Sequence, residues 1–159
     1  MTAPAERRPT ERQHWMSVLA RASAFDIERR LAACTKLPEY VRLRGPETGL
    51  VMTRGRAGGG GAPFNLGEIT VTRCTVRTPG GQVGHAYVTG RDARRAELAA
   101  CVDAGLQDPS LHEALHREVI EPLAAAQQAS RQETARRAAA TRVQFFTMAT
   151  MRSDDRAQT

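Results

Sequence analysis

An α+β fold, in which helices at both ends flank a mainly antiparallel sheet, is predicted by three features of the 159-residue sequence. Apolar residues recur at helical spacing near the N-terminus and in the C-terminal third, whereas the middle of the chain holds short β-prone runs. Glycine and proline clusters separate these runs and suit the turns between antiparallel strands. The length fits one domain, which we place at residues 10–150, and residues 1–9 and 151–159 read as disordered tails.

Two amphipathic helices are predicted at the N-terminal end. Thr10 and Gln13 form a capping box, after which four apolar residues share one helical face. These residues are Trp15, Val18, Leu19 and Ala22. This face either lies in the core or docks on another subunit, and the core is favoured because apolar helix stripes are usually internal. A second helix restarts at Ser23 and stops before Pro38, with an apolar stripe of Ile27, Leu31 and Cys34.

Four strands are predicted in the middle of the chain. The first pair, 40–44 and 50–53, is expected to form a hairpin around a turn at residues 45–49. A third strand spans residues 69–76, and its apolar alternation slips once near Thr72 and Arg73, which is typical of a β-bulge. The fourth strand spans residues 83–88 after a turn at Pro79. His85 shares one face of this strand with Val83 and Tyr87, so we expect a packed structural histidine among apolar neighbours. The functional alternative is a hydrogen bond to a substrate or to a carboxylate at an interface.

Helices are predicted again in the C-terminal third. Asp92 caps the first of them, which ends at Asp108 and Pro109 and carries Leu98, Ala99, Val102 and Leu106 on its apolar face. A further helix begins after Ser110. The run 122–140 is rich in alanine, glutamine and arginine and has high helix propensity. Residues 141–147 then alternate like a closing strand.

The segment Gly49–Cys74 carries the strongest hint of a binding function. Arg54 and Arg56 bracket a glycine, and a run of four further glycines follows: Gly58, Gly59, Gly60 and Gly61. Glycines reach positive φ and let backbone N–H groups converge on an anion, while a guanidinium matches the oxygens of a phosphate or phosphonate. The alternative is a flexible hairpin loop, because neither a Walker A motif nor a dinucleotide fingerprint is present.

Composition and charge exclude several classes of protein. The net charge is +6, yet basic and acidic residues are mixed and only 4% of residues are aromatic, so a base-stacking nucleic-acid surface is not expected. No stretch reaches the roughly 20 apolar residues of a membrane span, and the N-terminus lacks an apolar signal core. A cytoplasmic protein is therefore expected. The three cysteines form no paired motif and are interpreted as small buried residues.

His112 and His116 form a literal HExxH motif, which on a helix places two imidazoles on one face for Zn²⁺. A zinc hydrolase is therefore an alternative function. It is discounted because a catalytic zinc needs a third protein ligand, the metzincin extension is absent and Glu133 is the only plausible carboxylate downstream. We expect no metal on this chain.

Several separate blocks of the sequence together resemble the PhnG family, the G subunits of the carbon–phosphorus lyase core complex. The blocks span nearly the whole chain and comprise Arg12–Ala22, Gly49–Cys74, Gly84–Asp92, Ala96–Ala100, Ala139–Thr141 and Phe145–Met148. The resemblance implies a hetero-oligomer with PhnI, PhnH, PhnJ and PhnL-like subunits. It also implies a transferase reaction in which a phosphonate displaces adenine from ribose carbon 1 of ATP, giving alpha-D-ribose 1-methylphosphonate 5-triphosphate.

In this family the nucleosidase capacity is associated with PhnI, so the resemblance implies a required partner that is inactive alone, or a pure scaffold. ATP is then a substrate of the complex, and no cofactor is expected on this chain. Candidate contacts to phosphonate or triphosphate are Arg54, Arg56, Arg73, His85 and the four glycines of the run, and no catalytic residue is assigned. Candidate interface residues are Trp15, Phe64, Phe145 and Phe146.

Overall fold

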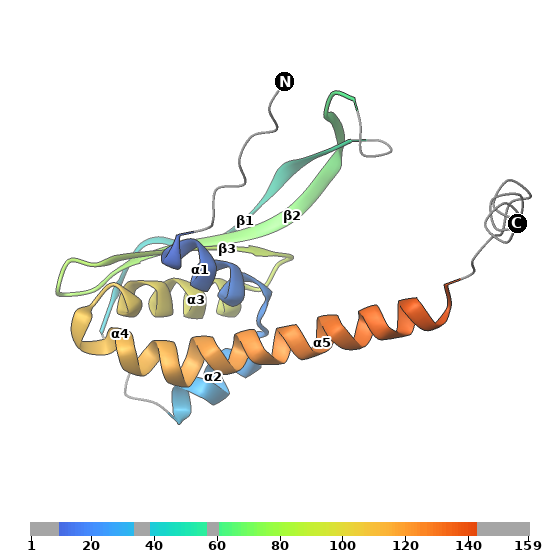
Figure 1. The fold of residues 1–159 in the computed structure, drawn as a ribbon. Helices are drawn as coiled ribbons and strands as arrows, with labels where there is room; N and C mark the ends of the chain where they lie inside the picture. The colour runs from blue at the N-terminus through green and yellow to red at the C-terminus, as the bar shows by residue number, and fades with distance from the viewer. Residues whose placement is uncertain (1–9, 34–38, 57–60, 143–159) are drawn as a thin grey trace, which may run out of the picture. The chain divides into compact units, whose positions relative to one another are not determined.

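The computed structural model describes residues 10–33, 39–56 and 61–142 (Figure 1). The chain divides into two compact units, the first ending at Gln127 and the second beginning at Gln128. Strands and most helices belong to the first unit. The prediction of one domain over residues 10–150 stays a prediction.

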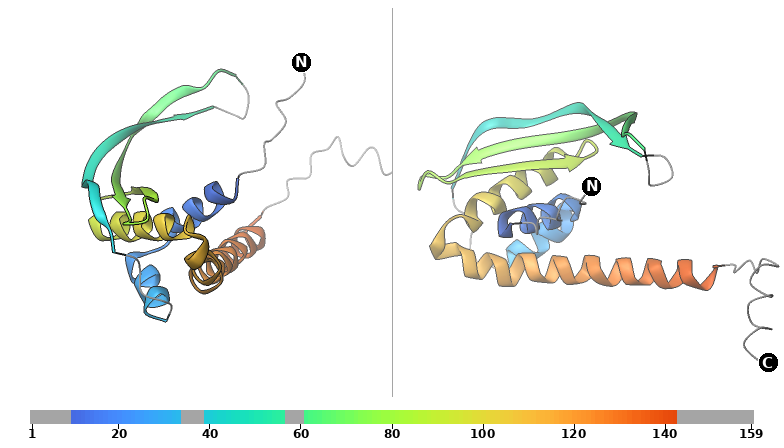
Figure 2. Two further views of the ribbon diagram at one scale, coloured as in Figure 1. Left: turned by 90° about the vertical axis from the view of Figure 1, so that its left-hand side faces the viewer. Right: turned by 45° about the horizontal axis from the view of Figure 1, so that its top comes forward.

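The sheet has three antiparallel strands in the order β1-β2-β3. They are β1 (Val41–Gly55), β2 (Phe64–Arg77) and β3 (Val83–Thr89). Helices precede and follow the sheet: α1 (Glu11–Arg21), α2 (Ala24–Ala32), α3 (Ala93–Leu106), α4 (Pro109–Leu115), a π-helical turn η2 (His116–Ile120) and α5 (Glu121–Ala140). Helices α1 and α3 lie on one side of the sheet (Figure 2). The predicted α+β class, with an antiparallel sheet and flanking helices, is confirmed.

The predicted helix starts are confirmed by their capping bonds. Thr10 and Gln13 form both bonds of the capping box on α1, Ser23 caps α2 and Asp92 caps α3. The apolar face of α1 is buried, and Trp15 is only 6% exposed. The core alternative for Trp15 therefore holds, and its indole offers almost no surface to a partner.

The predicted turn at residues 45–49 is wrong, because β1 runs through it as one continuous strand. Two register shifts against β2 lie between Arg42 and Glu47 and absorb extra residues on β1. Pro46 lies in this irregular stretch of an edge strand, where a missing N–H costs no ladder bond. Gly45 and Gly49 do not have positive φ, so neither adopts the conformation that a tight hairpin turn needs.

A register shift against β1 adjoins Arg73, between the pairing of Arg44 with Thr75 and that of Glu47 with Arg73, but the extra residue lies on β1 and not on β2 as predicted. The apolar pattern of β2 slips because apolar side chains occupy both of its faces. Thr72, Cys74 and Val76 are buried on the face toward the helices, whereas Ile69 lies on the opposite face and is 40% exposed. The buried hydroxyl of Thr72 is satisfied by the 2.7 Å hydrogen bond that it donates to the Gly90 carbonyl oxygen.

Strand β3 packs directly on α3. A Cβ placed on Gly84 would lie 2.0 Å from the Ala100 carbonyl oxygen and 2.6 Å from the Ala104 nitrogen. Only glycine fits at this crossing, and the facing turns of α3 carry the small residues Ala96, Ala100 and Ala104. Cys74 and Cys101 are buried in the same core, as predicted.

Several expectations lie outside the described residues: the closing strand beyond Arg142, Cys34, Gly58–Gly60, Phe145, Phe146 and both predicted tails. Among the helices that the structure describes, none is long and apolar enough to cross a membrane.

Candidate functional site

Arg54 and Arg56 lie toward the far end of the β1–β2 hairpin. Arg54 pairs with Asn65, Gly55 pairs with Phe64, and Arg56 follows the last residue of β1. Both arginine side chains are exposed, and within the described ranges no ion pair joins either of them to another residue. Gly61 has a φ of +85°, in line with the expected use of glycine at positive φ.

Arg73 lies elsewhere, on the face of the sheet away from the helices. Its Nε lies 2.6 Å from a Glu47 carboxylate oxygen, and Glu47 also pairs with Arg44. Hydrogen bonds to Tyr87 and Glu47 raise the pKa of Arg73. Arg73 is separated from the Arg54 end of the hairpin by about eight residues of β2, roughly 26 Å. The candidate arginines therefore do not converge on one anion within this chain.

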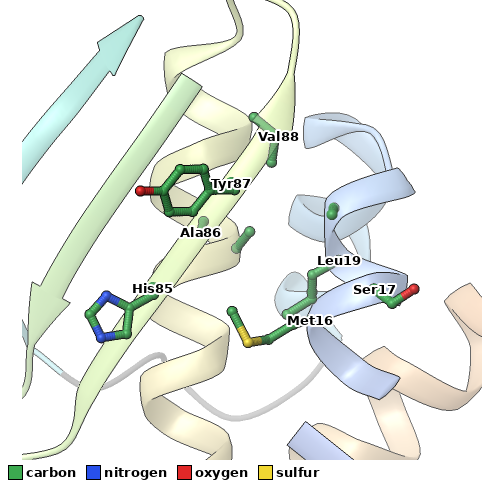
Figure 3. A pocket seen from close by; sticks show the side chains of 9 residues that line it. Met16, Ser17, Leu19, His85, Ala86, Tyr87 and Val88 are labelled. Atoms are coloured by element: carbon green, nitrogen blue, oxygen red, sulfur yellow. The ribbon is translucent and has the colours of Figure 1, made fainter. Parts of the chain in front are cut away.

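A groove of about 240 Å³ lies between α1 and β3 (Figure 3). Met16 and Leu19 of α1 face Ala86 and Val88 of β3 across it. The groove carries no charged side chain among its lining residues, so it suits an apolar side chain better than a phosphonate.

The expectation that His85 is packed among apolar neighbours is wrong. It occupies the exposed face of β3, and its ring and that of Tyr87 point away from Met16 and Leu19 (Figure 3). Its Nδ1 lies 3.2 Å from the Thr75 hydroxyl. Among the described residues, no carboxylate hydrogen-bonds to this ring to make it a poised base.

Asp103 is the most connected buried polar residue described. Its carboxylate is fully buried and accepts hydrogen bonds from Trp15 Nε1 at 2.9 Å, the His85 backbone N–H at 2.9 Å and Arg12 at 2.8 Å. Arg12 also donates to the Val83 carbonyl oxygen. One carboxylate therefore ties α1 and α3 to the free edge of β3, a structural role that satisfies polar groups at this edge.

Glu97 forms a second buried polar cluster. It accepts hydrogen bonds from the Tyr40 hydroxyl at 2.8 Å and Arg42 Nε at 2.7 Å. Burial acts to raise its pKa, but the bonds from Arg42 and Tyr40 outweigh this, and the pKa of Glu97 lies below its usual 4.5. Burial likewise raises the pKa of Tyr40 and raises that of Cys101 to about 12. Neither group is a ready nucleophile at neutral pH.

Replacing Glu97 by Gln is expected to destabilise the fold by roughly 1–2 kcal/mol at pH 7, because charged hydrogen bonds to Arg42 and Tyr40 weaken. The pKa of Glu97 is lowered on folding, so its contribution is present above pH 4.5 and is lost as the pH falls through the lower folded value. Unfolding in urea at pH 7 and pH 3 checks this. An equal stability difference at both pH values would contradict it.

The HExxH histidines form local contacts. His112 Nδ1 bonds to the Leu106 carbonyl oxygen at 2.7 Å, and the His112 and His116 rings stack with centroids 5.9 Å apart. Each histidine also lies near a carboxylate, Glu11 for His112 and Glu121 for His116. No group of three potential ligands with metal-binding geometry occurs among residues 10–33, 39–56 and 61–142. The described chain thus offers no third ligand for the discounted zinc site.

Sequence reasoning missed a set of exposed apolar side chains on the hairpin around Phe64, which is itself 48% exposed. They are Leu50, Val51, Met52, Leu66 and Ile69, with exposed fractions between 40% and 64%. Apolar residues at adjacent positions of a strand point to both faces of a sheet. Leu50, Val51 and Met52 are such a run, and this signal was available in the sequence.

Comparison with known proteins adds two findings. The family model described as "Phosphonate metabolism protein PhnG" matches residues 10–151. The chain is also similar to a curated protein of Rhizobium meliloti named "Alpha-D-ribose 1-methylphosphonate 5-triphosphate synthase subunit PhnG". The two are 48% identical over 141 residues, which cover 87% of this chain and 88% of the relative.

Proposed function

Because this chain belongs to the PhnG family of phosphonate metabolism proteins, we propose that it is a subunit of an alpha-D-ribose 1-methylphosphonate 5-triphosphate synthase. The observation that carries the proposal is the 48% identity to the Rhizobium meliloti subunit, which extends over 88% of that relative. The similarity thus includes the strands, helices and hairpin described above rather than one shared motif.

The proposed partners are PhnI, PhnH and PhnL, with PhnJ acting later in the same complex, and the proposed setting is the cytoplasm. In the reaction, a phosphonate oxygen forms a bond to ribose carbon 1 of ATP. The glycosidic bond breaks, and adenine leaves with the bonding electron pair and takes up a proton. ATP is a substrate of the complex, and this chain holds no cofactor in the proposal.

The chain's proposed contribution is support of the reaction rather than its acid–base chemistry. Cys74 and Cys101 are buried thiols with raised pKa values, and the exposed His85 ring hydrogen-bonds to a threonine hydroxyl rather than to an acid–base partner. Exposed arginines suit the anionic reactants, and electrostatic stabilisation by such groups is a large term in catalysis. The alternative is a scaffold that assembles the other subunits without touching substrate.

Growth on methylphosphonate as the only phosphorus source tests this proposal. A strain that carries the partner genes of the same source but lacks the gene for this chain is expected to grow only when the chain is supplied. Growth on inorganic phosphate is the control for general fitness. Equal growth on methylphosphonate without the chain would show that it is not a required subunit.

A further inference from the structure

The outer half of the β1–β2 hairpin extends past β3 (Figure 1). Strand β3 pairs only with Val71–Arg77 of β2, so Leu50–Gly55 and Phe64–Thr70 form a two-stranded ribbon, which we call the distal arm. Six large apolar side chains of the arm are at least 40% exposed: Leu50, Val51, Met52, Phe64, Leu66 and Ile69. A two-stranded hairpin is marginal in water by itself, and contiguous exposed apolar surface of this kind marks an interaction site.

The apolar side chains occupy both faces of the arm. Val51 and Ile69 are paired across the strands and share one face, whereas Leu50 and Met52 alternate with Val51 and lie on the other. Val51 is 42% exposed and Leu50 is 64% exposed, so neither face is covered by the other residues that the structure describes. A flat partner surface would leave one of these faces in water.

The same geometry argues against a second copy of this chain as the occupant. Two arms related by a two-fold axis bury the same face of each copy and leave the opposite faces exposed. A cleft with two apolar walls covers both faces at once. Since the closely similar Rhizobium meliloti protein is named as a synthase subunit, the cleft belongs to another subunit of the proposed synthase.

Charge at the far end of the arm indicates what lies deep in that cleft. Arg42 and Arg73, nearer the helices, are paired with Glu97 and Glu47. Arg54 and Arg56 have no such carboxylate partner in the part of the chain that the structure describes. A guanidinium that enters a water-poor cleft needs an anion to offset its lost hydration. The proposed reaction supplies such anions, because its reactants carry triphosphate and phosphonate oxygens.

We propose that the distal arm inserts between two apolar walls of another synthase subunit and brings Arg54 and Arg56 to the phosphate and phosphonate oxygens of the bound reactants. This inference rests on the proposed function. It assigns the arm's apolar side chains to assembly and its two arginines to the reaction, so the two roles are separable by substitution.

The assembly role is tested by co-expressing this chain with the partner subunits and measuring what co-purifies. The double variants Val51→Thr/Ile69→Thr and Leu50→Thr/Met52→Thr remove apolar surface from one face each and keep a β-prone residue. Co-purification is expected to fall at least about tenfold for each, which corresponds to about 1.4 kcal/mol. The matched control is Val41→Thr/Leu43→Thr, the same change on exposed residues of β1 outside the arm. Unchanged circular dichroism of each variant shows that folding is intact.

The role of the arginines is tested in the assembled complex. The double variant Arg54→Gln/Arg56→Gln is expected to assemble normally with the other subunits. At saturating ATP and methylphosphonate, its rate of adenine release is expected to be at least about tenfold lower than that of the wild type. Arg77→Gln, an exposed arginine of β2 outside the arm, is the control and is expected to leave the rate unchanged.

Each outcome decides between the possibilities. If the wild-type chain binds no other subunit, both the proposed function and the arm are overturned. If it binds but the arm variants assemble as well as the wild type, or no worse than the Val41→Thr/Leu43→Thr control, only the arm proposal fails. If arm variants lose self-association while assembly is unaffected, the arm pairs with a second copy. A full rate for the arginine double variant overturns the assignment of Arg54 and Arg56 to the reactants.

Discussion

Replacing Gly84 by Ala is expected to lower the free energy of unfolding by roughly 3 kcal/mol, at the upper end of the usual cost of overpacking. The added Cβ would meet the Ala100 carbonyl oxygen at 2.0 Å and the Ala104 nitrogen at 2.6 Å. Both atoms belong to the α3 backbone, so no side-chain rotation relieves the clash. The strand and helix must separate, and the packing between β3 and α3 is lost with them.

Gly45→Ala is the matched control for Gly84→Ala. No atom lies within 4 Å of the Cβ position at Gly45, and its φ is not positive, so its stability is expected to stay within about 0.5 kcal/mol of the wild type. Thermal unfolding followed by circular dichroism separates the two variants, with Gly84→Ala melting about 10 °C lower. Equal melting temperatures would mean that β3 and α3 do not cross as described.

Replacing Asp103 by Ala is expected to cost about 3 kcal/mol. The Trp15 indole N–H and the His85 backbone N–H both lose their acceptor in a buried site, and each unsatisfied donor costs about 1–3 kcal/mol. Loss of the ion pair with Arg12 adds less, since the Arg12 side chain is 40% exposed and partly screened by water.

Two comparisons sharpen the Asp103 experiment. Asp103→Asn retains one acceptor oxygen, but its side-chain NH₂ group would face the N–H donors that now bond to the carboxylate. It is therefore expected to recover only part of the stability that Asp103→Ala loses. Glu28→Ala removes an exposed ion pair with Arg94 and should cost less than about 1 kcal/mol. Urea unfolding measures all three variants. An Asp103→Ala variant as stable as Glu28→Ala would contradict the role assigned to the buried carboxylate.

The helical parts of the fold could be predicted because their signals are local. The Thr10–Gln13 capping box, Ser23 and Asp92 fix helix starts through bonds between residues three positions apart, and the structure contains each bond. The continuous β1 could not be predicted in this way. Gly45 and Pro46 are typical turn residues, and only pairing with β2 reveals that they lie in an irregular edge strand.

The sequence could name individual candidate site residues but not their arrangement in space. The sequence places Arg54 and Arg56 beside the glycine run between two strands, but their distance from Arg73 depends on strand register, which composition does not encode. His85 was misplaced because alternation tells which residues share a face and not which face is buried. Gly84 was missed as a packing position since the close approach of α3 is a long-range contact.

Formation of alpha-D-ribose 1-methylphosphonate 5-triphosphate by the purified partner subunits, with and without this chain, tests the central claim most directly. Adenine release and product formation from ATP and methylphosphonate are measured together in both mixtures. A required synthase subunit predicts product only when the chain is present, and partial adenine release at most when it is absent. Equal product formation in the two mixtures would contradict the account.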